Sequence, residues 1–164
     1  GGNTLMTPLR AASGTYVLWL SVPVPQTVTV GRLGAMTVRR GAYAYVGSAF
    51  GPGGVRARVR RHRAGTTAPH WHIDYLRPAG RMDQVWHTYD PERRECTWAQ
   101  ALRALPGART PADGFGASDC RCTAHLVHWA CAPTLAAFRE RVLPAAPVQA
   151  PIYVAPARSY DARP

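Results

Sequence analysis

The sequence predicts an α+β fold: a small central antiparallel sheet flanked by helices, with additional strands. Short apolar segments are separated by glycine or proline, as in antiparallel hairpins, and they cover 14–22, 28–30, 35–38 and 42–47. Two other segments, 55–63 and 91–105, carry apolar residues at helical spacing. The length of 164 residues is enough for one domain with a sizeable core.

The first of these segments has the clearest strand pattern. Tyr16, Leu18 and Leu20 alternate with Val17 and Trp19. Because successive side chains of a strand point to opposite faces, both faces of this strand are apolar. The pattern therefore predicts a strand that is buried on both sides.

The remaining elements follow from cap and turn residues. Asp90 and Pro91 form a helix start, an N-cap followed by a first-turn proline, and Gly65 ends the helix that begins at Val55. Further elements are expected as strands at 70–76, 84–89 and 125–129 and as a short helix at 135–142. We expect a flexible leader (1–13), one domain (14–143) and a flexible tail rich in proline and alanine (144–164).

The chain is strongly basic, with a formal net charge of +11. Such a charge attracts polyanions over about one Debye length, ~8–10 Å at physiological salt. Nucleic acid is the commonest partner of this kind, an anionic membrane surface is the next, and solubility alone is a third explanation. No run approaches the ~20 apolar residues of a membrane span, and residues 1–13 lack the pattern of a secretory signal. We expect a cytoplasmic protein with reduced thiols that binds DNA and no membrane.

Arg58 has an unusual place on the predicted helix 55–63. At ~100° per residue, Val55, Val59 and His62 form the inward stripe, and Arg58 lies beside it. Its guanidinium is expected to point over the sheet, where it can bind a phosphate bidentately without losing its charge. The alternative is an arginine that only packs its stem against the core. The arginines on the solvent flank are Arg56, Arg60 and Arg63.

Glu95 lies within the apolar stripe of the predicted helix 91–105. Ala99 at i+4 and Leu102 at i+7 fall on the same side. A carboxylate directed at a core is costly unless it is paired with a cation or a metal. A Mg²⁺ ion needs only one or two carboxylates and keeps several waters. The alternative is a purely structural ion pair with one of the many arginines.

Four motifs follow one another along the chain: Gly14-Thr15-Tyr16, then Tyr45-Val46-Gly47, then the helical segment with Arg58 and His62, and finally Glu95. This ordered series resembles the GIY-YIG nucleases. Three further segments are similar to the Uri-type, or domain-of-unknown-function, branch of that superfamily: 41–49, 70–76 (HWHIDYL) and 114–126. The resemblance covers residues 14–129, most of the chain.

The resemblance implies a divalent-metal-dependent DNA endonuclease that hydrolyses phosphodiester bonds. Tyr16 would be the general base or would orient the attacking water, and Tyr45 would bind that water or the scissile phosphate. Arg58 would stabilise the transition-state charge, and Glu95 would hold one Mg²⁺ or Mn²⁺. His62 would contact the phosphate or support a catalytic group. The alternative for both tyrosines and His62 is core packing with a polar tip.

DNA would be held along its backbone, without sequence reading, by basic and polar side chains around this site. The residues expected to do so are Ser48, Arg56, Arg60, Arg61 and Arg63. No small-molecule cofactor is expected beside the metal ion.

Two departures from the family pattern lead to a second hypothesis, a catalytically inactive nucleic-acid-binding module of the same fold. The gap between the two tyrosine motifs is longer than the usual hairpin. The family's late asparagine also has no match, since the only asparagine is Asn3. Ser118 or Asp119 would have to replace it.

A third hypothesis is a zinc-stabilised interaction domain. Cys120 and Cys122, followed by His125 and joined by His70 or His72, supply residue types that bind zinc. Their spacing differs from the common zinc ribbons and fingers. A packed loop with buried thiols is the simpler interpretation, so no zinc is expected.

Overall fold

The computed structural model describes residues 6–117, 124–146 and 149–156. The elements, in chain order, are β1 (Gly14–Val22), β2 (Gln26–Thr29), η1 (Gly31–Leu33), β3 (Ala35–Val38), β4 (Gly41–Ala49), α1 (Gly54–Ala64), α2 (His72–Leu76), η2 (Arg77–Ala79), β5 (Arg81–Thr88), α3 (Glu95–Arg103), β6 (Leu126–Trp129), α4 (Leu135–Ala145) and β7 (Tyr153–Pro156). A five-stranded antiparallel sheet has the order β6-β4-β1-β5-β7, and β2 and β3 form a separate hairpin. The predicted fold class is confirmed.

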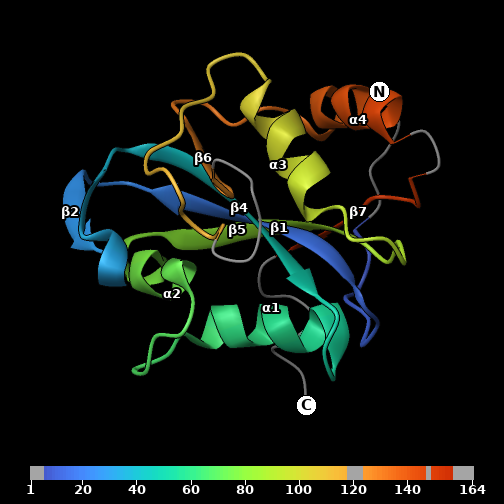
Figure 1. Cartoon of the computed structure of the whole chain (residues 1–164), viewed down its shortest axis with the longest axis horizontal. Coiled ribbons are helices and arrows are strands. Elements are labelled where there is room, and N and C mark those ends of the chain that lie inside the picture. The colour runs from blue at the N-terminus through green and yellow to red at the C-terminus, as the bar shows by residue number, and fades with distance from the viewer. Residues whose placement is uncertain (1–5, 118–123, 147–148, 157–164) are drawn as a thin grey trace.

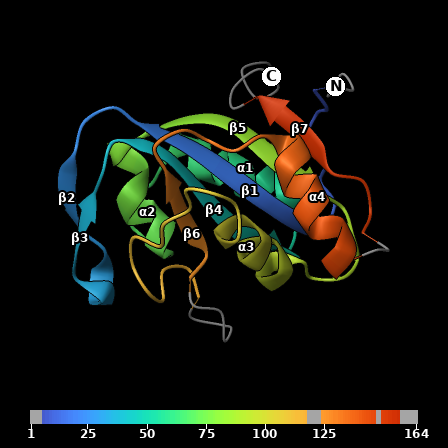
Figure 2. The ribbon, with the colours of Figure 1, turned by 90° about the horizontal axis from the view of Figure 1, so that it is seen from above.

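Helices cover both faces of the five-stranded sheet. Figure 1 shows α1 and α2 on one side and α3 and α4 on the other, and Figure 2 shows the sheet between these layers from above. Two apolar clusters result, one on each face. The sheet is therefore the middle layer of three, and the chain buries a core on either side of it.

Strand β1 is central, as its sequence predicts. Tyr16, Leu18 and Leu20 are buried in the cluster under α1 and α2. Val17 and Trp19 are buried in the cluster under α3 and α4. The prediction of a strand buried on both faces is confirmed.

The prediction of a strand at 70–76 is wrong, because this segment contains helix α2. The Asp74 carboxylate accepts hydrogen bonds from the backbone N–H groups of His70 and Trp71, at 2.8 and 2.9 Å. These bonds satisfy donors at the helix start, as an N-terminal cap does. Ile73 and Leu76 are both buried, and their i, i+3 spacing fits one side of a helix.

Helix α3 begins at Glu95, four residues later than Asp90 and Pro91 predict. The Asp90 carboxylate makes a local turn instead, accepting from the backbone N–H of Glu92 at 3.0 Å. It also accepts from the Arg94 side chain at 3.0 Å and from the backbone N–H of Ala150 at 2.9 Å. These partners keep the carboxylate from capping a helix at Pro91.

The described parts of the predicted leader and tail lie against the edge of the sheet. Strand β7 lies in the tail and pairs with β5, and Val154 of this strand is buried. In the leader, Met6 forms a bridge with Val154 and Leu9 is buried. Pairing and burial at a sheet edge offset the low helix and strand propensity of a proline-rich segment.

No helix among the described residues is both long and apolar enough to cross a membrane.

Candidate active site

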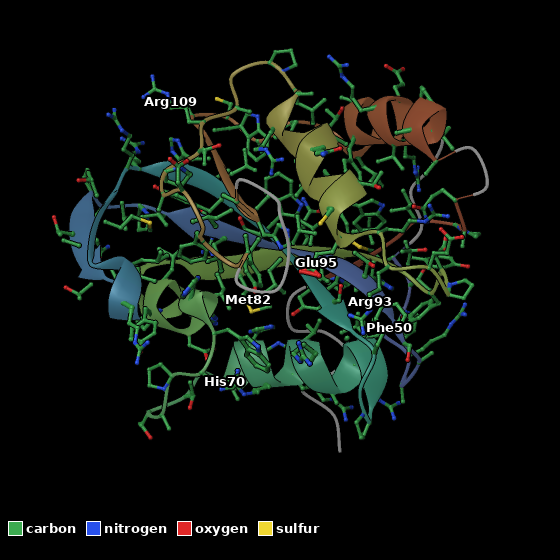
Figure 3. All side chains as sticks on the ribbon, viewed as in Figure 1. Phe50, His70, Met82, Arg93, Glu95 and Arg109 are labelled. Atoms are coloured by element: carbon green, nitrogen blue, oxygen red, sulfur yellow. The ribbon has the colours of Figure 1, made fainter. Side chains whose placement is uncertain are left out.

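A cavity of about 820 Å³ lies beside the second half of β4. Strand β6 pairs only with residues 42–45 of β4, so the end of β4 is open to side chains from both helical layers. The lining residues that carry charge or a large ring include Phe50, Arg58, Trp71, Arg93 and Glu95. Figure 3 shows Glu95 near the middle of the molecule, with Phe50 and Arg93 on one side and His70 on the other. Glu95 is the one carboxylate that lines this cavity in the part of the chain that the structure describes.

Ser48 connects Arg58 to Glu95. Its backbone carbonyl accepts a hydrogen bond from Arg58 Nη1 at 3.0 Å. Its hydroxyl donates to Glu95 Oε1 at 2.7 Å. One residue of β4 thus fixes a cation from α1 and an anion from α3 at the same cavity, although the two helices lie on opposite faces of the sheet.

His125 completes the surroundings of the Glu95 carboxylate. Its Nδ1 lies 2.9 Å from Oε2. Burial raises the pKa of Glu95, but the close contact with His125 and the hydrogen bond from Ser48 lower it more, so that the net pKa is below its ordinary value. The carboxylate is therefore ionised at neutral pH. It is also a first-turn residue of α3, where the helix dipole favours a negative charge.

Arg58 is held by an aromatic ring as well as by Ser48. Its guanidinium carbon lies 4.3 Å from the centroid of Trp71, and that of Arg61 lies 4.1 Å away. Cation–π contacts of this kind stabilise the charged groups and limit their rotation. Arg61 also donates hydrogen bonds to both carboxylate oxygens of Asp74 at 3.1 Å. Both of its Nη atoms therefore have a partner within the protein. DNA binding by Arg61 stays a prediction.

Asp74→Asn is expected to destabilise the fold and to loosen the cavity wall formed by Trp71. The carboxylate accepts from Arg61 and from two backbone N–H groups, and an amide would leave one buried donor without an acceptor. We expect a loss of about 1–3 kcal/mol in the free energy of unfolding at neutral pH, measured by urea denaturation.

The stability that Asp74 contributes should depend on pH. Burial raises its pKa, but the hydrogen bonds from Arg61 and from the His70 and Trp71 backbone lower it more, for a net decrease. The contribution is thus present above the ordinary pKa of ~3.9 and is lost as the pH falls through the lowered value. Asp83→Asn is the control, because Asp83 is exposed and its ion pair with Arg81 is at the surface; it should cost about 0.5 kcal/mol or less. Equal losses in both variants would contradict this role of Asp74.

The two tyrosines of the predicted site differ in access. Tyr45 lines the cavity, and among residues 6–117, 124–146 and 149–156 its hydroxyl has no hydrogen-bond partner. Tyr16 is only 1% exposed and does not line the cavity. Burial raises the pKa of both phenols, so each hydroxyl is neutral at physiological pH.

Tyr16 instead forms a buried pair with His62. Its hydroxyl lies 2.8 Å from Nε2 of the imidazole. Burial, together with the charges of nearby arginines, lowers the pKa of His62 to about 3 despite the opposite effect of Asp74. His62 is therefore neutral. The charge of Arg58 opposes the effect of burial and lowers the pKa of Tyr16, so the guanidinium lies near the phenol.

The second tyrosine motif ends in Gly47, where only a glycine leaves room for the Tyr16 side chain. A Cβ at this position would lie 2.5 Å from the Tyr16 hydroxyl and from its ring carbon. Since real side chains do not approach so closely, any other residue would push the β4 backbone or the phenol away. The absence of a side chain at Gly47 therefore lets Tyr16 lie directly beneath the cavity wall.

The other predicted DNA-binding arginines lie on α1. Arg56 and Arg60 are exposed, and Arg63 is half-buried. Ser48, expected to bind DNA, is placed between Arg58 and Glu95 and is half-buried. The solvent flank of α1 is thus basic, as its sequence predicts.

Several cavity residues are not predicted as nuclease-site residues by the sequence, and Phe50, Trp71, Arg93 and His125 are among them. Trp71 belongs to the HWHIDYL segment (70–76). The prediction of a strand for this segment does not place the Trp71 side chain at the site. The sequence indicates His125 only as a zinc ligand, although it approaches Glu95. The contact of the Arg93 guanidinium with the Phe50 ring, at 4.5 Å, joins segments about 40 residues apart and has no signal in the sequence.

The cysteines differ in one respect from the expectation of reduced thiols. Cys96 is disulfide-bonded, which corrects that expectation, whereas Cys131 is free and exposed. Cys120 and Cys122, and the proposed asparagine substitutes Ser118 and Asp119, lie outside the described residues. Within the described ranges, no three side chains of the histidine, cysteine, aspartate or glutamate type form a metal-holding group.

Glu95 fits a magnesium or manganese site of the kind that uses one carboxylate. The side chain is 25% exposed and lines the cavity, and the lowered pKa keeps it charged. Each carboxylate oxygen has a second lone pair beyond the contact with Ser48 or His125. Mg²⁺ is commonly bound by one or two carboxylates, with waters and substrate phosphates as the other ligands.

Comparison with known protein families matches residues 15–146 to the family described as "Domain of unknown function DUF123". The matched range includes Tyr16, Tyr45, Arg58, Glu95 and His125. No curated protein and no solved structure matches the chain.

Proposed function

The chain belongs to the family described as domain of unknown function DUF123, and we propose that it is a metal-dependent endonuclease that hydrolyses phosphodiester bonds of DNA. One observation carries the proposal: Arg58 and Glu95 are both held by Ser48 at a single cavity. An arginine fixed beside a metal-binding carboxylate is suited to a phosphate group, because one binds its oxygens and the other holds the cation that neutralises them.

Two further properties of the molecule favour a nucleic acid as the substrate. The formal net charge of +11 attracts polyanions. The cavity also has Phe50 and Trp71 in its lining, and rings of this kind stack with nucleobases. The resemblance of the tyrosine motifs to the GIY-YIG nucleases agrees with this substrate class.

The position of each cavity residue indicates its role in the reaction. Arg58 binds the scissile phosphate and stabilises the charge that develops on it, with its guanidinium fixed by Ser48 and Trp71. Tyr45 offers the attacking water a hydroxyl at the cavity wall. In the reaction the water oxygen bonds to phosphorus and the water gives up one proton to solvent, while the bond to the leaving oxygen breaks and that oxygen takes up one proton from solvent.

Tyr16 and His62 would act through Arg58. The raised pKa of Tyr16 works against its role as a general base, and Nε2 of the neutral His62 lies 2.8 Å from the phenol oxygen. We therefore assign this pair to positioning the guanidinium. Glu95 would hold one Mg²⁺ or Mn²⁺, which supplies Lewis-acid stabilisation of negative charge on the phosphate oxygens.

The test is cleavage of single-stranded, duplex and branched DNA by the purified protein with Mn²⁺ or Mg²⁺, and with a chelator as the control. We expect cleavage of at least one substrate, abolished when the metal is chelated. Salt-sensitive DNA binding without cleavage under any metal would contradict the endonuclease and leave the inactive DNA-binding module as the function.

A further inference from the structure

A second basic cavity lies toward the other end of β4 from the candidate active site. We name it the Arg39–Arg109 groove; it measures about 280 Å³, and its polar lining residues are Thr37, Arg39, Tyr43, Arg109, Thr110 and His128. A neighbouring hollow shares Arg39, Arg109 and His128 and adds Arg40. Figure 3 shows Arg109 at the edge of the molecule, away from Glu95 and the residues labelled around it.

The charge of this groove is not neutralised within the described part of the chain. Arg39, Arg40 and Arg109 are exposed, and none of their guanidinium groups makes an ion pair or hydrogen bond with another described residue. No carboxylate among the described residues lines either hollow. By contrast, Arg61 and Arg94 are each paired with an aspartate. Three cations that gather without an anion leave a site for an external one.

The backbone that carries the three arginines is fixed, chiefly through His128. His128 and Arg109 exchange two backbone hydrogen bonds, at 2.8 and 2.9 Å. The His128 imidazole donates from Nε2 to the Arg40 carbonyl at 2.9 Å, and the Tyr43 hydroxyl donates to the Arg39 carbonyl at 2.9 Å. Both walls of the groove are therefore joined to the same two residues, Tyr43 and His128, whose rings pack at 4.7 Å.

The chemistry of the lining fits a phosphate group. Arg39 and Arg109 offer planar guanidinium forks that match phosphate oxygens, and Thr37 and Thr110 offer hydroxyl donors of the kind that contact DNA phosphates. His128 does not serve as a donor here, because its Nε2 donates to the Arg40 carbonyl and its Nδ1 is buried. It acts as a positioning residue for the arginines.

We propose that the Arg39–Arg109 groove binds a backbone phosphate of duplex DNA remote from the phosphate that is cleaved. Tyr43 in the groove and Ser48 in the candidate active site are five residues apart on β4, about 17 Å at ~3.4 Å per residue. That distance corresponds to about five base pairs along a duplex axis at ~3.4 Å per pair. The choice of DNA as occupant rests on the proposed function, whereas the phosphate chemistry of the groove does not.

The test compares the double variant Arg39→Ala/Arg109→Ala with wild type in binding to a duplex oligonucleotide at several salt concentrations. We expect Kd to rise by at least about 10-fold and the slope of log K against log salt to decrease in magnitude by about 2, one for each arginine–phosphate pair that the substitutions remove. The matched control is Arg32→Ala/Arg141→Ala, which removes the same charge from exposed residues that line none of these hollows. It should keep the wild-type slope.

Equal slopes for the two double variants would overturn the proposal, because the effect would then be one of net charge. Titration with inorganic phosphate, followed by NMR of the arginine side chains, separates the possible sources of the anion. Loss of phosphate binding together with wild-type DNA binding in Arg39→Ala/Arg109→Ala would also overturn it. Failure of the wild-type protein to cleave DNA refutes the endonuclease alone, since the binding comparison needs no cleavage.

Discussion

Glu95→Gln is expected to reduce the rate of metal-dependent DNA cleavage by at least about 10²–10³-fold. The amide keeps the size of the side chain and can still accept from Ser48, which now donates to Oε1 at 2.7 Å. It carries no charge, so it binds Mg²⁺ or Mn²⁺ poorly. The measurement is single-turnover cleavage of the substrate that wild type cuts best.

Metal binding supplies a second readout for Glu95→Gln. Electron paramagnetic resonance of Mn²⁺ should show weaker binding than in wild type, whether or not DNA is cleaved. Glu92→Gln is the matched control, because Glu92 is 72% exposed and does not line the cavity. We expect Glu92→Gln to cleave DNA like wild type. Wild-type rates in Glu95→Gln would refute the proposed metal ligand.

Arg58→Lys is expected to lower the cleavage rate by about 10²–10³-fold while leaving the net charge unchanged. Lysine has one ammonium group in place of the planar fork. It cannot keep the hydrogen bond to the Ser48 carbonyl and the contact with Trp71 and also bind two phosphate oxygens. The decrease should therefore appear in kcat, with little change in the salt dependence of DNA binding.

Arg56→Lys is the control for this substitution. Arg56 lies on the same helix, two residues earlier, and is exposed. Its expected contact is with the DNA backbone, where a lysine can replace it. We expect cleavage within about threefold of wild type. If Arg58→Lys behaves like Arg56→Lys, the guanidinium geometry has no part in the reaction.

Local patterns in the sequence were sufficient wherever neighbours along the chain decide the structure. The alternation at Tyr16 to Leu20 predicts a strand buried on both faces, and that strand is β1. The stripe of Val55, Val59 and His62 predicts the inward side of α1. Arg58 lies at the edge of that stripe, as its position on the helix predicts, since helical spacing depends on the backbone alone.

Local patterns gave wrong predictions where a carboxylate or strand edge that they assign to a local role bonds to a residue far away in the sequence. The Asp90 carboxylate binds Ala150, some sixty residues away, in place of starting α3. Asp74 caps α2 and binds Arg61. These bonds stabilise a helix in the segment 70–76, which the sequence predicts as a strand. Strand β7 forms in a proline-rich tail because β5 presents an edge to pair with.

The order of residues was enough to name Tyr45, Arg58 and Glu95, which line the cavity, and to predict on which side of its helix Arg58 lies. Only the packed fold shows that Ser48 joins Arg58 to Glu95, that His125 approaches the carboxylate, and that Tyr45 lines the cavity while Tyr16 lies beneath it. The difference comes from the range of the interactions. Secondary structure follows from atoms a few residues apart, whereas a cavity at a sheet edge exists only after strands and helices from distant segments have packed together.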